Sequence, residues 1–528
     1  MNLKRLVIVF VINAVISFGY YFQNRDADVT EISSDLANII PICKKLDDPS
    51  LFKQDLFLND INDVKYYTPF YVQSLRFFAF FTQGDYLQAL NLLSLFTHLI
   101  YGLSWFFLFY AIGKDFLLAL LFSVFFRGIL WPPGGELLGI SDLWTIMPRT
   151  VFTAIAPLPF LIFRLSSKYN LALAAFVLGI ISNFHPISGV GAIVIYFSAY
   201  IVNAHFTGSL LDRKFIRKLI LAMACCIAGL LPYLITYVLH IKVEPQFSDE
   251  LYNQAFRRRI SDIFVQPLQF ILSWKRPILV FFLVPFVVYY FFDTSRHKRN
   301  FKILFTAILI LFLTANSLVY IENAVNGLFE KKLRMSFQLI RYQKFLLVLL
   351  QVATFLLICE LCAKFKIGAK AKIGALALFF ILAFFSSHPV FSRLPLVGDD
   401  MMTSILPDAF KFYNAPGEDP QEGLAEIISD AKTLTPKDAV FYGSYLVRSG
   451  ADRSVVLDSK GAGMLIEGNM NKFVQWYLDE KQFKSLEAAP KIDFLRSKNV
   501  DYVIVDTVWS GQAMIKSRGK YKLYKISQ

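Results

Sequence analysis

The sequence predicts a polytopic α-helical membrane protein that carries a small extracytoplasmic α/β domain at its C-terminal end. Of its 528 residues, 55% are hydrophobic and 54 are Phe, a composition too apolar for a soluble chain of this length. Apolar runs near the roughly 20 residues that a helix needs to cross a bilayer recur as far as residue 390. Beyond that point short β-rich runs alternate with charged helical stretches, which is typical of an α/β domain.

About eleven runs qualify as transmembrane helices by their length and hydropathy. They lie near 4–22, 86–112, 115–130, 150–164, 170–183, 187–203, 219–240, 277–292, 301–320, 344–363 and 373–389. The boundaries of the spans between 115 and 203 stay open. The first run follows Lys4 and Arg5 as a signal peptide would, but no cleavage site of the A-x-A kind follows, so we expect an uncleaved helix.

Lys and Arg in the loops predict a cytoplasmic N-terminus, because positive charges of membrane proteins gather on the inner side. In this orientation the basic loops lie inside: Lys114, Arg164, Lys168, 212–218, 295–302 and 364–372. The outer face of the inner or plasma membrane then holds 23–85, 131–149, 241–276, 321–343 and everything after 390. The net charge of +14 arises largely from the inner loops, so it does not indicate nucleic acid binding.

Two domains are expected, a transmembrane domain over 1–390 and the extracytoplasmic α/β domain over 391–528. The first outer loop, 23–85, is far longer than a simple connector, and such loops are usually functional. Apolar spacing around 36–46 and 66–81 predicts helices that lie along the membrane surface. In the C-terminal domain we expect strands near 439–443, 454–458, 500–506 and 521–527.

Asp26 and Asp28 form a D-x-D pair just after the first predicted helix. A carboxylate at the outer end of that helix can act as a general base toward a hydroxyl, or hold a divalent cation. The alternative is that these acids only solvate an outer loop, and a single D-x-D does not decide between the two.

A second set of candidates lies in the loop 127–150, which contains Glu136, Asp142, Trp144 and Arg149. Aromatic faces and carboxylates suit a sugar-binding site, although Trp at a membrane interface is also an ordinary anchor. His185 lies in "SNFHPISGVG", which predicts a broken helix that lines a wet cavity or is buried in protein. Its role is equally open between a cavity ligand and a structural hydrogen bond.

Cations on the outer side break the charge bias and form a third set. They are Lys331, Lys332, Arg334 and Arg341, with Arg258 from "FRRRIS". Arg is the bidentate ligand of phosphate, so these residues suit a phosphate or pyrophosphate group. Loose binding of anionic headgroups is the alternative.

The arrangement of acids after the first helix, surface helices in a long first outer loop and an outer C-terminal domain resembles the GT-C superfamily of membrane glycosyltransferases. Poorly characterised bacterial GT-C-like proteins are similar in the D-P-x-L-F-x-x-D stretch, here Asp48 to Asp55. They are also similar in "FHPISG" and in "TPKDAVFYG…RSVVLDSKG" (435–461).

The resemblance implies an inverting glycosyltransferase of the cell envelope, active in polysaccharide biosynthesis. It would move a sugar from a polyprenyl-phosphate-linked donor to a glycan, lipid or protein acceptor on the outer face. Asp26 or Asp28 would be the base, Arg341 would bind the lipid phosphate, and Mg²⁺ or Mn²⁺ is left open as a cofactor. The Asp-Glu pair of some GT-C families is absent.

Two other readings compete with the enzyme. A transporter or flippase needs charges near the membrane midplane and often shows inverted repeats, and no repeat is visible here. A non-catalytic component of polysaccharide assembly would share the hydropathy without needing acids after the first helix.

Overall fold

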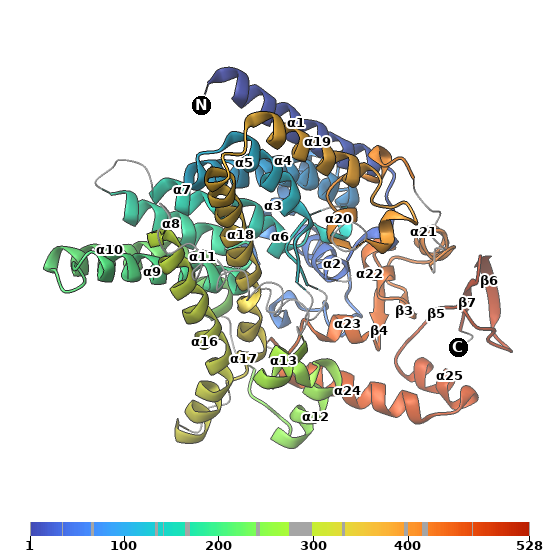
Figure 1. Ribbon diagram of the computed structural model, residues 1–528. Coiled ribbons are helices and arrows are strands. Elements are labelled where there is room, and N and C mark those ends of the chain that lie inside the picture. The colour runs from blue at the N-terminus through green and yellow to red at the C-terminus, as the bar shows by residue number, and fades with distance from the viewer. Residues whose placement is uncertain are drawn as a thin grey trace. The chain divides into compact units, whose positions relative to one another are not determined.

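The computed structural model describes residues 2–33, 35–64, 68–131, 136–140, 142–163, 169–238, 243–273, 298–329, 333–394, 400–413, 421–466 and 468–526. Most of these residues are helical (Figure 1). The chain forms two compact units. The membrane unit comprises 1–25, 91–233 and 262–415, and the loop–domain unit comprises 26–90, 234–261 and 416–528.

The membrane unit is built from helices. They are α1 (Leu3–Gln23), α4 (Tyr86–Gly113, whose first turn belongs to the other unit), α5 (Phe116–Phe125), α6 (Pro148–Ile155), α7 (Pro157–Phe163), α8 (Asn170–Ser182), α9 (Pro186–Phe206), α10 (Arg213–Gly229), α11 (Leu231–Tyr233), α13 (Pro267–Ser273), α16 (Lys298–Phe329), α17 (Ser336–Leu339), α18 (Phe345–Lys364), α19 (Ala369–Phe384) and α20 (Asp400–Thr403). Two short strands, β1 (Leu130–Trp131) and β2 (Glu136–Leu137), pair antiparallel.

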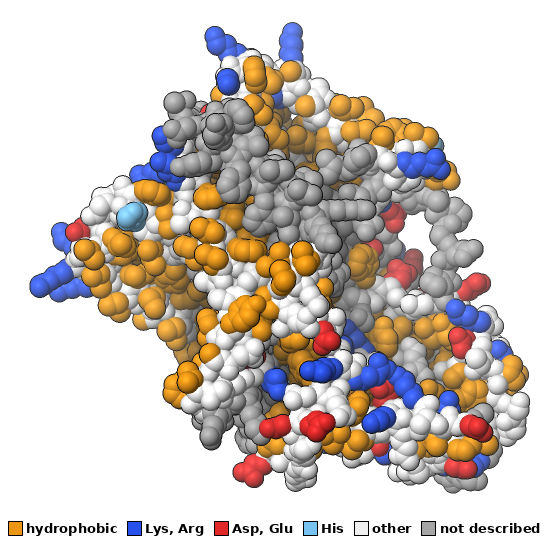
Figure 2. Space-filling view, turned by 60° about the horizontal axis from the view of Figure 1, so that its bottom comes forward, with side chains coloured by type: hydrophobic (Ala, Val, Ile, Leu, Met, Phe, Trp, Pro, Cys, Tyr) orange, Lys and Arg blue, Asp and Glu red, His pale blue; other side chains and the backbone are white. Residues whose placement is uncertain are grey.

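Five of the described helices are long and apolar enough to cross a membrane, or six if the pair broken after Gly229 is one span. Hydrophobic side chains cover much of the visible surface (Figure 2). The exposed hydrophobic residues include Ile216, Ile220 and Ile227 of α10, as expected for lipid contact. The protein is therefore a multi-pass membrane protein. The count of about eleven spans stays a prediction, and the run 277–292 lies outside the described residues.

A break between α8 and α9 lies where "SNFHPISGVG" predicts one. Asn183 follows α8, and its side chain satisfies backbone groups near a second break, between α10 and α11. Its Nδ2 donates to the Gly229 carbonyl at 2.9 Å, and its Oδ1 accepts from the Tyr233 amide at 2.7 Å. Because lipid offers no partner for free backbone groups, this amide allows two interrupted helices to pack together.

The loop–domain unit joins the first outer loop to the C-terminal domain. The loop contributes the 3-10 turns η1 (Val29–Glu31) and η2 (Ile61–Asp63), α2 (Leu36–Asp47) and α3 (Pro69–Phe81), and α12 (Asp249–Arg259) comes from a later segment. The C-terminal domain contains α21 (Leu424–Leu434), β3 (Val440–Tyr442), α22 (Leu446–Gly450), β4 (Ser454–Val456), α23 (Ser459–Ala462), α24 (Met470–Ser485), α25 (Ala488–Ser497), β5 (Tyr502–Val505), β6 (Ala513–Arg518) and β7 (Tyr521–Lys525). The segments of the two units alternate along the sequence. The division into domains over 1–390 and 391–528 stays a prediction.

The five-stranded sheet has the order β4-β3-β5-β7-β6. The strands β4, β3 and β5 are parallel, and β7 and β6 continue the sheet antiparallel. The small C-terminal α/β domain and four of its strands are thus confirmed. Strand β6 is missing from the sequence prediction because all six of its residues are exposed and give no apolar alternation.

Helix α3 is amphipathic in the way a membrane-surface helix requires. Its buried face, with Tyr71 and Leu75, packs in the loop–domain unit, where α2 and α3 are neighbours. Phe77, Phe80 and Phe81 are exposed at its C-terminal end. Exposed Phe side chains on a helix too short to span a bilayer fit contact with the headgroup region.

Candidate functional site

The acid segment, residues 26–38, begins just after α1. Asp26 is exposed, and the described residues offer no hydrogen bond to its carboxylate. Asp28 is half-buried and caps η1, because its Oδ1 accepts from the Thr30 amide at 2.7 Å and from Thr30 Oγ1 at 2.6 Å. Of the two acids, Asp26 therefore has the carboxylate that is available to a ligand.

The turn η1 is held by α22 of the C-terminal domain. Val29 is buried, and α22 and η1 are in contact. A Cβ atom added to Gly450 would lie 3.3 Å from both γ-carbons of Val29 and 2.6 Å from Ile428. The absence of a side chain at Gly450 thus lets the acid segment pack closely against α22.

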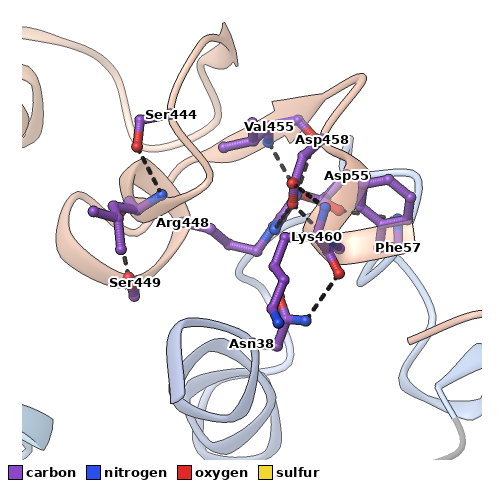
Figure 3. Close-up of polar contacts among 11 residues, drawn as sticks. Asn38, Asp55, Phe57, Ser444, Arg448, Ser449, Val455, Asp458 and Lys460 are labelled. Carbon is purple, nitrogen blue, oxygen red and sulfur yellow. Dashed lines mark hydrogen bonds and ion pairs between the residues drawn. The ribbon is translucent and has the colours of Figure 1, made fainter. Parts of the chain in front are cut away.

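A buried ionic cluster lies beside this contact (Figure 3). Arg448 of α22 is fully buried, and it donates from Nε to Asp55 at 2.8 Å and from Nη1 to Asp458 at 2.9 Å. Asp55 also accepts from the Phe57 and Val455 amides, each at 2.9 Å. Burial lowers the pKa of Arg448, but the two carboxylates outweigh it, so the pKa lies above its ordinary value. The cluster joins two stretches quoted for the GT-C resemblance, 48–55 and 435–461.

Arg341 lies in the cation turn, residues 336–344, which comprises α17 and the 3-10 turn η9 (Ile340–Lys344) of the membrane unit. Its Nη1 donates to Gln338 at 3.0 Å, and its guanidinium lies 5.1 Å from the centroid of the Phe264 ring. Arg334 is exposed just before the turn. Lys331 and Lys332 lie outside the described residues.

Hydrogen bonds with side chains of α16 hold the cation turn. Gln343 is buried, and its side chain shares hydrogen bonds with that of Asn316 of α16. Glu322 of α16 accepts from the Met335 and Ser336 amides at 2.7 and 2.9 Å and so anchors the start of α17. Sequence reasoning missed Lys344, which ends the turn and is only 1% exposed. A Lys at the start of an apolar span was the available signal.

The second predicted set lies partly beside the cation turn. Arg149 is buried in the first turn of α6, and Phe152 of the same helix contacts Phe345 with ring centroids 6.0 Å apart. The helix that bears Arg149 therefore packs against the residue that follows Lys344. Asp142 is half-buried and Trp144 is exposed in the loop before α6, while Glu136 lies in β2.

His185 is buried and caps α9. Its Nδ1 accepts from the Ser188 amide at 3.1 Å and lies 2.8 Å from Ser188 Oγ. Arg258, in the loop–domain unit, forms two hydrogen bonds of 2.9 Å with Glu480. Burial raises the pKa of Glu480, but Arg258 and Lys484 outweigh it and lower the pKa. A phosphate at Arg258 would have to compete with this carboxylate, so its ligand role stays a prediction.

Sequence reasoning also missed a buried arginine in the membrane unit. Arg127 is fully buried, and its Nη2 donates to Asn13 Oδ1 at 2.8 Å and to the His98 carbonyl at 2.9 Å. The ring of Tyr20 stacks on that of His98 with centroids 4.1 Å apart. The signal was a charge at the end of an apolar span, which is costly unless it has partners.

Asp26 and Asp28 are the two candidate metal ligands of the acid segment, and this role stays a prediction. Among the residues that the structure describes, no group of three or more His, Cys, Asp or Glu side chains could hold a metal ion. In addition, Asp28 already caps η1 with one of its oxygens. We therefore derive no chemical step through a metal.

No family model matches the chain, and no curated protein matches it. The fold expected from the sequence resemblance is confirmed by a likeness over the whole chain to a solved structure. Among solved structures, the chain is similar to the crystal structure of ArnT from Cupriavidus metallidurans bound to undecaprenyl phosphate. The TM-score is 0.52 and the identity is 10%, with 100% of this chain and 99% of that chain covered.

Proposed function

We propose that the protein is a membrane glycosyltransferase that moves a sugar from a polyprenyl-phosphate-linked donor to an acceptor on the outer face of the membrane. The observation that carries the proposal is a likeness in fold, over the whole chain, to a protein solved with undecaprenyl phosphate. The exposed carboxylate of Asp26 just after the first helix supports it, since sugar transfer needs a base that an acceptor can reach.

In the proposed mechanism Asp26 takes the proton of an acceptor hydroxyl, and the acceptor oxygen forms a bond to the anomeric carbon. The bond from that carbon to the phosphate oxygen breaks, and polyprenyl phosphate leaves with the electron pair. Attack opposite the leaving group inverts the anomeric centre. Arg341, with Arg334, Lys331, Lys332 and Lys344 as further candidates, would stabilise the charge on the departing phosphate.

The second set of residues would bind the sugar or acceptor. We assign this role to Asp142, Trp144, Arg149 and Glu136, because their side chains offer the aromatic faces and hydrogen-bonding groups that sugars require. His185 would act indirectly, since its Nδ1 caps α9. Asp28 is the alternate base, and it would also orient the acid segment as the cap of η1.

Reconstitution tests the activity. We would place the full chain in liposomes, supply a panel of synthetic polyprenyl-phosphate-linked sugars, and measure the release of free polyprenyl phosphate. Asp26→Asn should lower release by about 10²-fold or more, while Asp438→Asn, a change at an exposed aspartate of the C-terminal domain, should leave it unchanged. Movement of the intact lipid-linked sugar across the bilayer without release would instead favour a flippase.

Divalent cations can be tested in the same assay. A chelator followed by addition of Mg²⁺ or Mn²⁺ separates transfer that needs a cation from transfer by the protein groups alone. The proposed orientation has its own measurement: a reporter fused after Gln528 should be active only outside the cytoplasm.

A further inference from the structure

The carboxyl edge of the parallel strands in the C-terminal domain is the place where α/β sheets usually bind a ligand. Strand β3 has β4 on one side and β5 on the other, so the chain order reverses at β3. The segments that leave this edge, α22 after β3 and α23 after β4, carry Arg448, Asp458 and Lys460. The first outer loop binds Arg448 and Lys460 directly, and it reaches Asp458 through Arg448.

Four contacts make this engagement, and three of them join residues that are labelled in Figure 3. Arg448 binds Asp55 inside the core, and Asp55 accepts from the Val455 amide of β4. Nearer the surface, Lys460 donates from Nζ to Asp35 at 2.7 Å, and Asn38 donates from Nδ2 to the Lys460 carbonyl at 3.0 Å. The loop therefore occupies the edge where another α/β domain would hold a separate ligand.

Segments at this edge contact the acid segment at two places, η1 and the start of α2. Asp35 and Asn38 lie at the start of α2, on the C-terminal side of η1. The close approach of Gly450 to Val29 fixes η1 itself, which Asp28 caps. The chain from Asp28 to Asn38 is thus held at both ends by α22 and α23.

We propose that the C-terminal domain is a clamp for the first outer loop, and that Lys460 and Gly450 are positioning residues that place Asp26 and Asp28 for catalysis. This inference rests on the proposed function for its effect on turnover, but the clamp itself does not. Lys460 is the residue to vary, because the side chains of Lys460 and Asp35 are 22% and 44% exposed. An ion pair of that exposure stabilises little, so its loss should not unfold the domain, whereas a reversed charge at position 460 repels Asp35 and displaces the start of α2.

The test is a charge swap in the full chain. Lys460→Glu and Asp35→Lys should each lower turnover about tenfold at saturating donor while leaving the donor KM unchanged, and the double variant should recover most of the loss. Lys498→Glu is the matched control, because Lys498 forms a similar ion pair with Asp479 within the C-terminal domain. Wild-type turnover in both single variants, or a double variant no better than either, would overturn the clamp.

Gly450→Ala tests the clamp without changing the charge of the protein. Its new methyl group would press on Val29 and Ile428, so we expect lower turnover with an unchanged donor KM. A variant with wild-type turnover would exclude a positioning role for Gly450.

Hydrogen exchange of the backbone amides of Val29 to Asn38 gives a readout that needs no activity. Exchange should rise in Lys460→Glu and return in the swap, but not change in Lys498→Glu. If the exchange behaves in this way while the wild-type protein transfers no sugar, the clamp stands and the proposed function fails. Unchanged exchange in Lys460→Glu would reject the clamp.

Discussion

The acid segment carries the proposed base, and the cation turn carries the proposed phosphate ligand. Different kinds of contact hold these two regions. An ion pair between Lys460 and Asp35 holds the acid segment, and a second pair, between Arg448 and Asp55, holds a later part of the same loop. The cation turn is held by the amides of Asn316 and Gln343 and by the Glu322 carboxylate, which accepts from backbone amides. A charge or polar group that leaves water is costly unless it has a partner, so both regions depend on such contacts.

The two buried arginines show the same difference. Arg448 has two carboxylate partners, and the described partners of Arg127 are an amide oxygen, a carbonyl and an imidazole. We therefore expect the stability of the loop–domain unit to fall when charges are removed or the pH is lowered. Changes in the cation turn should mainly weaken donor binding, through loss of the ligand-binding group. The following changes test this, from the largest expected effect to the smallest.

Arg448→Met should have the largest effect, because it leaves Asp55 and Asp458 buried without their cation. Removing one partner of a buried ion pair typically costs about 3–5 kcal/mol. We expect early loss of the loop–domain unit in thermal unfolding and limited proteolysis of the full chain. Adding Asp55→Asn and Asp458→Asn should restore part of the stability, and a melting midpoint unchanged by Arg448→Met alone would contradict the comparison.

Asp26→Asn should lower turnover by about 10²-fold or more while the protein stays folded, since general-base catalysis contributes on that scale. Asp28→Asn should have a smaller effect, because an Asn side chain can still cap η1. The measurement is release of polyprenyl phosphate at saturating donor. If both variants transfer sugar at the wild-type rate, the base lies elsewhere, and Asp142 and Glu136 are next.

Arg341→Ala should weaken donor binding about tenfold or more, because a hydrogen bond to a charged group contributes about 1.5–3 kcal/mol. Turnover at saturating donor should fall less than in Asp26→Asn. Arg393→Ala, at an exposed arginine of the membrane unit, is the control. An unchanged donor KM in Arg341→Ala would favour the alternative role, in which this residue binds anionic headgroups loosely at the membrane interface.

Acid should selectively loosen the contact between α2 and α22. Burial raises the pKa of Asp452, but the ammonium groups of Lys44 and Lys432 outweigh it and lower the pKa below its ordinary 3.8. A depressed carboxyl pKa stabilises the folded state above about pH 3.8, and this contribution is lost as the pH falls through the folded-state value.

Burial lowers the pKa of Lys44, and the Asp452 carboxylate opposes that shift. Thermal unfolding should show a decline in midpoint below about pH 4 that is smaller in Asp452→Asn. An identical decline in the variant would assign the acid sensitivity to other carboxylates, such as Glu480.

The sequence by itself determined the features that depend on local pattern. Apolar runs located α1, α4, α9, α16 and α18, and the alternation after residue 420 located four of the five strands of the C-terminal sheet. Asn183, Pro186 and the glycines near them predicted the break between α8 and α9, because Pro lacks an amide donor and is tolerated mainly in the first turn of a helix, and Gly has a low helix propensity. The acids after the first helix and the cations before α18 were also visible as departures from the expected charge pattern.

Only the tertiary structure decided which distant segments meet. Asp55 and Arg448 are 393 residues apart, and Asp35 and Lys460 are 425 apart, so no local signal pairs them. The same holds for Arg127, whose partners Asn13 and His98 come from other helices. A charged side chain that becomes buried needs a partner. Packing between distant elements determines which residue that partner is, so a local sequence pattern does not predict it.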